Sequence, residues 1–122
     1  MKTEIATTKE QSRRLLDCGV SADTADMIGI EPNYGYECEP WSSMHGQDTR
    51  GYFPVWSLSA LLSIMPDLEH CFSLWKFEED DTYAADATMV NPDFRVDAND
   101  PIEACVGLIE ILQANGYKLN EQ

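Results

Sequence analysis

The amino-acid sequence predicts an α+β fold, in which a small antiparallel sheet of two to three strands packs against an N-terminal helix, a short middle helix and a long C-terminal helix. Helix start and stop signals stand near both ends of the chain, and two strand-like segments flank the acidic run 78–81. The last helix also carries an apolar stripe that a small sheet can cover. The length of 122 residues suits a single domain, 1–122.

The N-terminal helix is predicted over residues 8–18. Thr7 and Glu10 have the spacing of a capping box, and Gly19 stands where a helix C-terminal glycine is expected. In the segment that follows, Ser21 can act as an N-cap but few apolar residues anchor a helix. This predicts one short helical turn that leads into a loop.

The middle of the chain combines an irregular segment with a short helix. Residues 29–52 are rich in Gly, Pro and Tyr and have no sustained period, so an irregular loop is expected there. The short helix lies between Pro54 and Pro66, and Ser57 can cap it. Its predicted apolar stripe consists of Leu58, Leu61, Leu62 and Met65. We assign Trp56 and these leucines to the core.

An antiparallel hairpin is predicted in the second half of the chain. The apolar segment 70–77 precedes the polar run 78–81, and the segment 82–90 alternates in polarity. A possible third strand follows, with Phe94 and Val96 on one face. The polar run is therefore expected to form the turn of the hairpin.

The C-terminal helix has the clearest boundaries. Asp100 can act as its N-cap, Pro101 suits the first helical position, and Gly116 can end it. The residues of its apolar stripe are Cys105, Val106, Ile109 and Leu112, and those opposite are Glu103, Gly107 and Glu110. The stripe is expected to pack on the sheet.

Charge restricts the partners of the protein. Against 22 Asp and Glu stand only 8 Lys and Arg, a formal net charge of −14, which repels nucleic acid and anionic membranes alike. The acidic residues concentrate in the middle, since residues 66–103 hold eleven of them and two basic ones. No apolar leader and no apolar run of about 18 residues occurs, so a cytoplasmic protein is expected, without direct binding of nucleic acid or membrane.

No catalytic or cofactor motif of high specificity occurs, and no cofactor is expected. The glycines do not form a phosphate-binding loop, and the cysteines are expected to be free thiols. An alternative is a metal protein or a Cys/His enzyme that draws on Cys38, His45, His70 and Cys71. No Cys-x-x-Cys or His-x-x-x-His spacing supports this alternative.

Two features are typical of an interaction surface. Clustered carboxylates steer association with a basic partner, and aromatic residues near a long loop are common interface anchors. The predicted partner-binding residues are Glu78, Glu79, Asp80, Asp81, Trp41 and Tyr36. The alternative is a solvated hairpin turn and aromatic residues that fill the core. A non-enzymatic protein-protein interaction module is the favoured function.

Three segments resemble small uncharacterised proteins of bacterial prophages and mobile elements. They are QSRRLLDCGVSADTADM at 11–27, PVWSLSALLSIMP at 54–66 and DPIEACVGLIEILQANGY at 100–117. Segment 29–51 is longer than the short link usual in such proteins. The resemblance implies a genomic setting in a phage or mobile element and a shared core more than an activity. The expected partner is a host or phage protein. Fold analogy adds an antitoxin-like regulatory partner as a further alternative.

Overall fold

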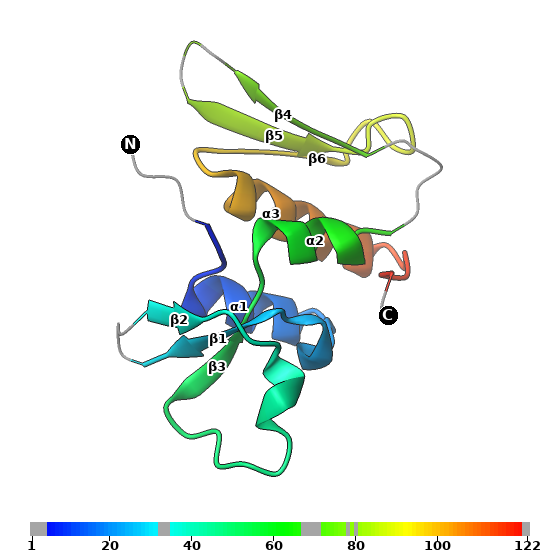
Figure 1. Ribbon diagram of the computed structural model, residues 1–122. Helices are drawn as coiled ribbons and strands as arrows, with labels where there is room; N and C mark the ends of the chain where they lie inside the picture. The colour runs from blue at the N-terminus through cyan, green and yellow to red at the C-terminus, as the bar shows by residue number, and fades with distance from the viewer. Residues whose placement is uncertain (1–4, 32–34, 67–71, 78, 80, 121–122) are drawn as a thin grey trace.

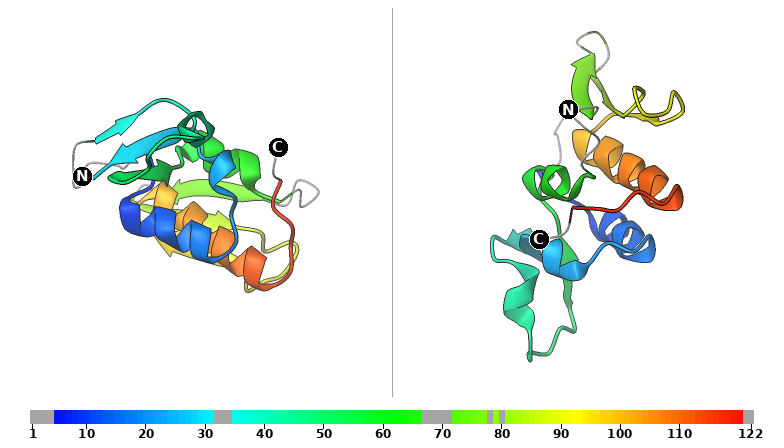
Figure 2. Two further views of the ribbon diagram at one scale, coloured as in Figure 1. Left: turned by 90° about the horizontal axis from the view of Figure 1, so that it is seen from below. Right: turned by 90° about the vertical axis from the view of Figure 1, so that its right-hand side faces the viewer.

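Two three-stranded antiparallel sheets lie at opposite ends of the molecule, with the helices between them (Figures 1 and 2). The computed structural model describes residues 5–31, 35–66, 72–77, 79 and 81–120. The strands are β1 (Met27–Ile30), β2 (Gly35–Glu37), β3 (Tyr52–Val55), β4 (Ser73–Phe77), β5 (Thr82–Asp86) and β6 (Arg95–Ala98). The sheet orders are β2-β1-β3 and β4-β5-β6. The predicted α+β class and the predicted hairpin with its third strand are confirmed.

The irregular loop predicted at 29–52 is wrong in part, because parts of all three strands of the first sheet lie in this segment. This segment contains the end of β1, all of β2, the 3₁₀ helix η2 (Trp41–Met44) and the start of β3. Strands of three or four residues are too short for alternating polarity to be recognised. In addition, Gly29 and Gly35 lie inside paired strands, although glycine in a sequence usually indicates a turn.

Helix α1 (Lys9–Asp17) begins one residue later than predicted. Its capping box is formed by Thr8 and Gln11, since Thr8 Oγ1 accepts from Gln11 N at 3.2 Å and Gln11 Oε1 accepts from Thr8 N at 2.9 Å. Thr7, the predicted cap, is buried, and its Oγ1 accepts from Trp56 N at 3.0 Å. The Thr7 hydroxyl therefore joins the chain start to the core instead of capping the helix. The short turn expected next is the 3₁₀ helix η1 (Ala22–Thr24).

Helix α3 (Pro101–Ala114) is the central element of the molecule. Asp100 caps it as predicted, with Asp100 Oδ1 accepting from Ile102 N at 2.7 Å. The predicted stripe is fully buried, and α3 packs on α1, α2, β5 and β6. Gly107 permits a close approach to the second sheet, because a Cβ there would lie 2.9 Å from Val96 Cγ1.

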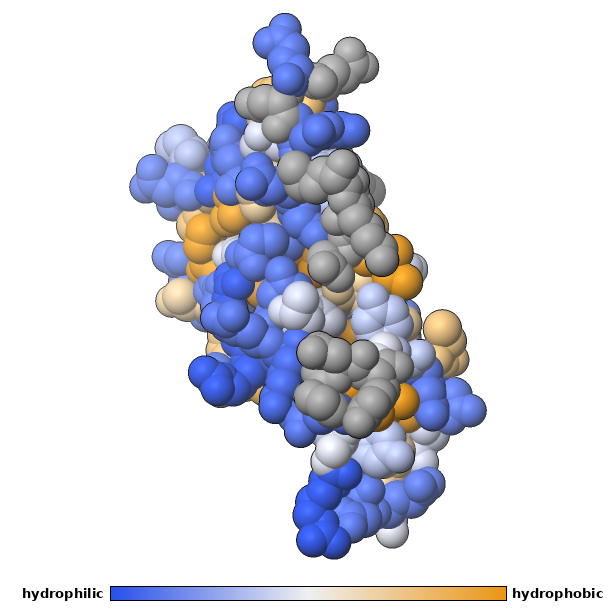
Figure 3. Space-filling model, turned by 90° about the vertical axis from the view of Figure 1, so that its left-hand side faces the viewer, coloured by the Kyte–Doolittle hydropathy of each residue, from blue (hydrophilic) through white to orange (hydrophobic). Residues whose placement is uncertain are grey.

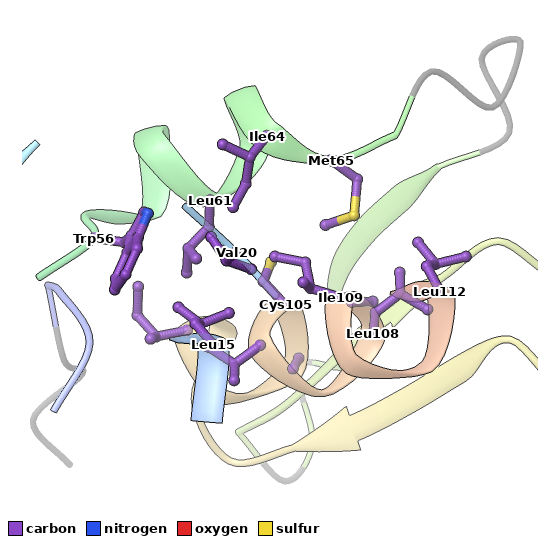
Figure 4. Packing of buried hydrophobic residues seen from close by; sticks show 14 of the residues in the cluster. Leu15, Val20, Trp56, Leu61, Ile64, Met65, Cys105, Leu108, Ile109 and Leu112 are labelled. Atoms are coloured by element: carbon purple, nitrogen blue, oxygen red, sulfur yellow. The ribbon is translucent and has the colours of Figure 1, made fainter. Parts of the chain in front are cut away.

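Helix α2 (Leu58–Ile64) lies beside α3 and is capped by Ser57 as predicted. Figure 4 shows Leu61 and Ile64 of this helix pointing toward α3, and Trp56 at its start is fully buried as expected. Leu62 is 40% exposed, so its assignment to the core is wrong. The reason is that α3 covers only one side of this two-turn helix, and Ile64, not Leu62, lies on the covered side.

One face of the molecule is largely polar. The face shown in Figure 3 is mostly hydrophilic, and its hydrophobic residues form small separate patches. Among the helices of the described residues, none has the length and apolar character needed to cross a bilayer. Sites for partners must therefore be sought among small patches.

Candidate functional site

The second sheet has one face against α3 and one face that no described element covers (Figures 1 and 2). Leu74 and Val96 pack against the main core on the α3 side. Because side chains alternate along a strand, their neighbours point to the outer face. The residues on this outer face are Ser73, Trp75, Phe77, Thr82, Ala84, Asp86, Arg95 and Asp97.

Trp75 is held in place on the outer face by its neighbours. It stands opposite Ala84, whose small side chain is completely buried, so the indole ring has room to lie across the sheet. Its Nε1–H donates to Asp86 Oδ2 at 2.7 Å, and its ring centre lies 4.4 Å from that of Phe77. The side chain remains 39% exposed. It is an anchored aromatic residue with a free face toward solvent.

Arg95 reaches the two rings from β6, which is the opposite edge strand of the sheet from β4. Its guanidinium carbon lies 5.1 Å from the ring centre of Trp75 and 5.6 Å from that of Phe77, which is cation–π distance. Arg95 Nε donates to Asp97 Oδ1 at 2.8 Å, and this bond raises the pKa of Arg95. We call Trp75, Phe77, Asp86, Arg95 and Asp97 the outer-face cluster.

The outer-face cluster has the chemistry of a binding surface. Trp and Arg are enriched among residues that dominate binding energy at protein interfaces. Here the hydrogen bond to Asp86 and the ion pair with Asp97 fix both side chains before any partner arrives, which lowers the entropy lost on binding. The aromatic, arginine and carboxylate side chains of the cluster are a combination typical of recognition surfaces.

The acidic residues predicted to bind a partner lie at the turn of the same hairpin. Glu79 and Asp81 are exposed, and Asp81 Oδ1 lies 3.6 Å from Lys76 Nζ. Asp81 has a φ of 53°, the left-handed conformation that Asp tolerates in tight turns. Glu78 and Asp80 lie outside the described residues. The carboxylates of Glu79 and Asp81 therefore lie at the hairpin end of β4, the strand that carries Trp75 and Phe77.

The aromatic residues predicted for the site lie elsewhere. Trp41 starts η2, is half-buried against the main core, and donates its backbone N–H to Ala25 O at 3.1 Å. Tyr36 is partly exposed in β2, opposite Gly29 of β1. Tyr36 belongs to the first sheet and Trp41 to η2, and both elements lie at the other end of the molecule from the second sheet (Figure 1). The structure thus divides the predicted residues between two places, and partner binding by either set stays a prediction.

Trp75, Phe77 and Arg95 were not among the residues predicted from the sequence. A signal for them exists in the strand SLWKF. Because side chains alternate along a strand, Trp75 and Phe77 point to one face of the sheet and Leu74 points to the other. A strand with apolar residues on both faces needs two covering layers, and a small domain with one long helix can supply only one. The uncovered aromatic residues are then candidates for an interface.

The metal alternative finds no support in the part of the chain that the structure describes. No group of three or more His, Cys, Asp or Glu side chains there could hold a metal ion. His45 Nε2 lies 3.2 Å from Asp23 Oδ1 in a mostly exposed pair, and Cys38 is exposed. His70 and Cys71 lie outside the described residues, so a site that depends on them stays a prediction.

The described cysteines Cys18, Cys38 and Cys105 are free thiols, and they differ in accessibility. Burial raises the pKa of Cys105 to about 12, and nearby Asp100 adds to this effect. We expect iodoacetamide at about pH 8 to label Cys38 in the native protein and Cys105 only after unfolding, because thiolate is the reactive form. Peptide mass spectrometry measures both sites. Equal labelling of the two in native protein would contradict the buried position of Cys105.

Comparison of the chain with protein-family models, with curated proteins and with solved structures finds no match in any of the three. No relative therefore supplies a substrate, a partner or a catalytic residue.

Proposed function

We propose that this protein is a non-enzymatic interaction module that binds a basic surface of a partner protein through the outer-face cluster and the adjacent acidic turn. The observation that carries this proposal is the pair Trp75 and Arg95, side by side on an uncovered sheet face. Anchored aromatic and arginine side chains with a free face are typical centres of protein interfaces.

The charge of the site sets the character of the partner. Within the cluster, the single positive charge of Arg95 is paired with Asp97, so Asp86 leaves a net negative charge. Glu79 and Asp81 extend this negative region along the hairpin, in a chain of net charge −14. A partner with Lys and Arg at its contact surface would be attracted before contact, and salt would weaken the attraction.

The biological setting is part of the proposal. We place the protein in the cytoplasm as an accessory protein of a prophage or mobile element, on the basis of its composition and the three segments that resemble such proteins. In that setting a basic cleft of a host or phage protein is a suitable target for a carboxylate-rich surface.

Replacing Trp75 with serine is expected to weaken partner binding about tenfold, because the central aromatic contact is lost. The tagged full-length chain is first used to isolate its partner from cell lysate at low and high salt. Isothermal titration calorimetry with the purified partner then compares the wild type with Trp75→Ser.

The matched control is Leu62→Ser, which removes another exposed apolar side chain on α2, away from the second sheet. A second variant changes Glu79 and Asp81 to serine and should reduce the salt dependence of binding. Equal affinities of Trp75→Ser and Leu62→Ser would reject the outer-face cluster as the contact surface.

A further inference from the structure

A groove of about 560 Å³ separates helix α1 from strand β3, at the other end of the molecule from the outer-face cluster. Lys9, Arg13 and Leu16 line it from α1, and Phe53 and Pro54 line it from β3. We call it the α1–β3 groove. Its lining differs from the rest of this acidic chain, because cations border an apolar floor.

The floor of the groove is fixed by a glycine. Phe53 stands directly opposite Gly29, and its ring lies so close that a Cβ at position 29 would be 2.4 Å from Phe53 Cζ. The ring therefore occupies the space that a side chain of β1 would fill, as aromatic residues do opposite glycine in sheets. Leu16 completes the floor from α1 and is 38% exposed. This apolar surface exists before any ligand binds.

The cations lie in a row along the helix. Lys9, Arg13 and Leu16 are spaced i, i+4 and i+7, which places them on one face of α1. Lys9 is paired with Glu31. Arg13 is exposed and forms no ion pair with any residue that the structure describes. In a chain of net charge −14, an arginine with no ion pair among the described residues, next to exposed apolar side chains, marks a place where an anionic group is favoured.

The backbone at the free edge of β3 indicates whether a ligand binds there as an extended strand or as a helix. β3 is an edge strand in the order β2-β1-β3, which is where a foreign strand can add to a sheet. However, Pro54 lies in the middle of β3 and has no N–H, so the free edge lacks a donor that strand addition needs. A helix satisfies its own backbone and can enter such a groove by its side chains alone.

We propose that the α1–β3 groove binds an acidic amphipathic helix of a partner protein. Apolar side chains at i, i+3, i+4 and i+7 of that helix pack on Leu16 and Phe53, and its carboxylates pair with Arg13 and with Lys9. The groove lining holds two cations, Lys9 and Arg13, and one carboxylate, Glu10, and the groove lies apart from the outer-face cluster. The protein then holds an acidic helix at one end and a basic surface at the other.

Glu10 affects the affinity of the groove for an acidic helix. It lines the same groove as Arg13 and stands three residues before it on α1, so it partly opposes an incoming carboxylate. Changing Glu10 to glutamine keeps the size of the side chain and removes its charge. This variant should bind the acidic helix about two to three times more tightly. Unchanged or weaker binding by the variant contradicts the proposed position of the carboxylates.

The test uses two designed peptides with the same leucine pattern, one with glutamate and one with lysine at the remaining positions. Fluorescence anisotropy at low salt measures affinity for the full chain, and ¹⁵N NMR spectra locate each peptide. The glutamate peptide should shift the amide signals of Leu16 and Phe53 and of their neighbours. Shifts confined to other residues, or no binding at millimolar peptide, would overturn the proposal.

Charge-matched variants separate a specific contact from a general charge effect. Arg13→Glu should weaken binding of the glutamate peptide by about tenfold or more, whereas Arg50→Glu should leave it unchanged. Arg50 is exposed, is paired with Asp48, and lies outside the groove lining, so both variants change the net charge equally. Equal losses in both variants would show that overall charge alone controls binding. The lysine peptide tests the outer-face cluster separately, so the two proposals can fail independently.

Discussion

Replacing Trp56 with alanine is expected to lower the free energy of unfolding by about 3–5 kcal/mol. The indole is fully buried at the start of α2, where three parts of the chain meet. Its Nε1–H donates to Thr24 Oγ1 at 2.9 Å, and its backbone N–H donates to Thr7 Oγ1 at 3.0 Å. Truncation leaves a cavity in the core and removes the indole N–H that donates to Thr24 Oγ1, which still donates to Ser21 O.

Urea unfolding followed by far-ultraviolet circular dichroism measures this loss. The matched control is Trp75→Ala, the same substitution at a partly exposed position on the outer face. This control should cost about 1–2 kcal/mol, clearly less than Trp56→Ala, since Trp75 is already 39% exposed and loses less burial. If both variants lost the same free energy, the central position of Trp56 in the core would be wrong.

Replacing Arg14 with alanine is expected to cost about 2 kcal/mol at neutral pH, between the values for exposed and buried ion pairs because its groups are about one-third exposed. Arg14 Nη1 donates to Glu103 Oε1 at 2.7 Å, and Arg14 Nη2 donates to Glu110 Oε1 at 2.5 Å. The hydrogen bonds to Glu110 and Glu103 raise the pKa of Arg14, so it stays charged. Without it, the two carboxylates of α3 face α1 with no arginine beside them, and among the described residues Glu103 keeps only the hydrogen bond from Gln11.

The effect of Arg14 should depend on pH. Burial acts to raise the pKa of Glu103, but the hydrogen bonds from Arg14 and Gln11 outweigh it and lower the pKa. A lowered pKa contributes stability above the unfolded value, and this contribution is lost as the pH falls through the folded value. The stability gap between wild type and Arg14→Ala should therefore be large at about pH 7 and small at about pH 3.

The same urea experiment at both pH values tests this dependence. Arg13→Ala is the matched control, because Arg13 is the neighbouring arginine and is exposed on the other side of α1 from α3. It should change stability by no more than about 0.5 kcal/mol. A gap for Arg14→Ala that stays the same from neutral to acidic pH would exclude a charge-based role for the pair.

The elements predicted correctly from sequence are those with strong local signals. Asp100 and Pro101 define the start of α3, Ser57 caps α2, and the hairpin follows from its alternation. The first sheet could not be predicted in this way. Its short strands pair with segments far away in the sequence, as Ile28 does with Pro54. Such long-range pairing produces no periodic pattern of polarity within either segment.

The candidate sites were predictable only in part. Acidic residues such as Glu79 and Asp81 stand at an exposed turn, which their polarity already indicates. The role of Trp75 depends on which face of the sheet α3 covers, and that is a property of the packed chain. The α1–β3 groove likewise depends on a close approach between Phe53 and Gly29, which are far apart in the sequence.

The three tryptophans of the chain lie in three different surroundings, so their intrinsic fluorescence can report on three regions of the molecule. Trp56 is sealed in the core, Trp41 is half-buried in η2, and Trp75 faces solvent beside Arg95. Variants that keep a single tryptophan would report on separate regions without an added dye. The emission of Trp75 would follow a partner arriving at the second sheet, while that of Trp56 would follow only the opening of the core.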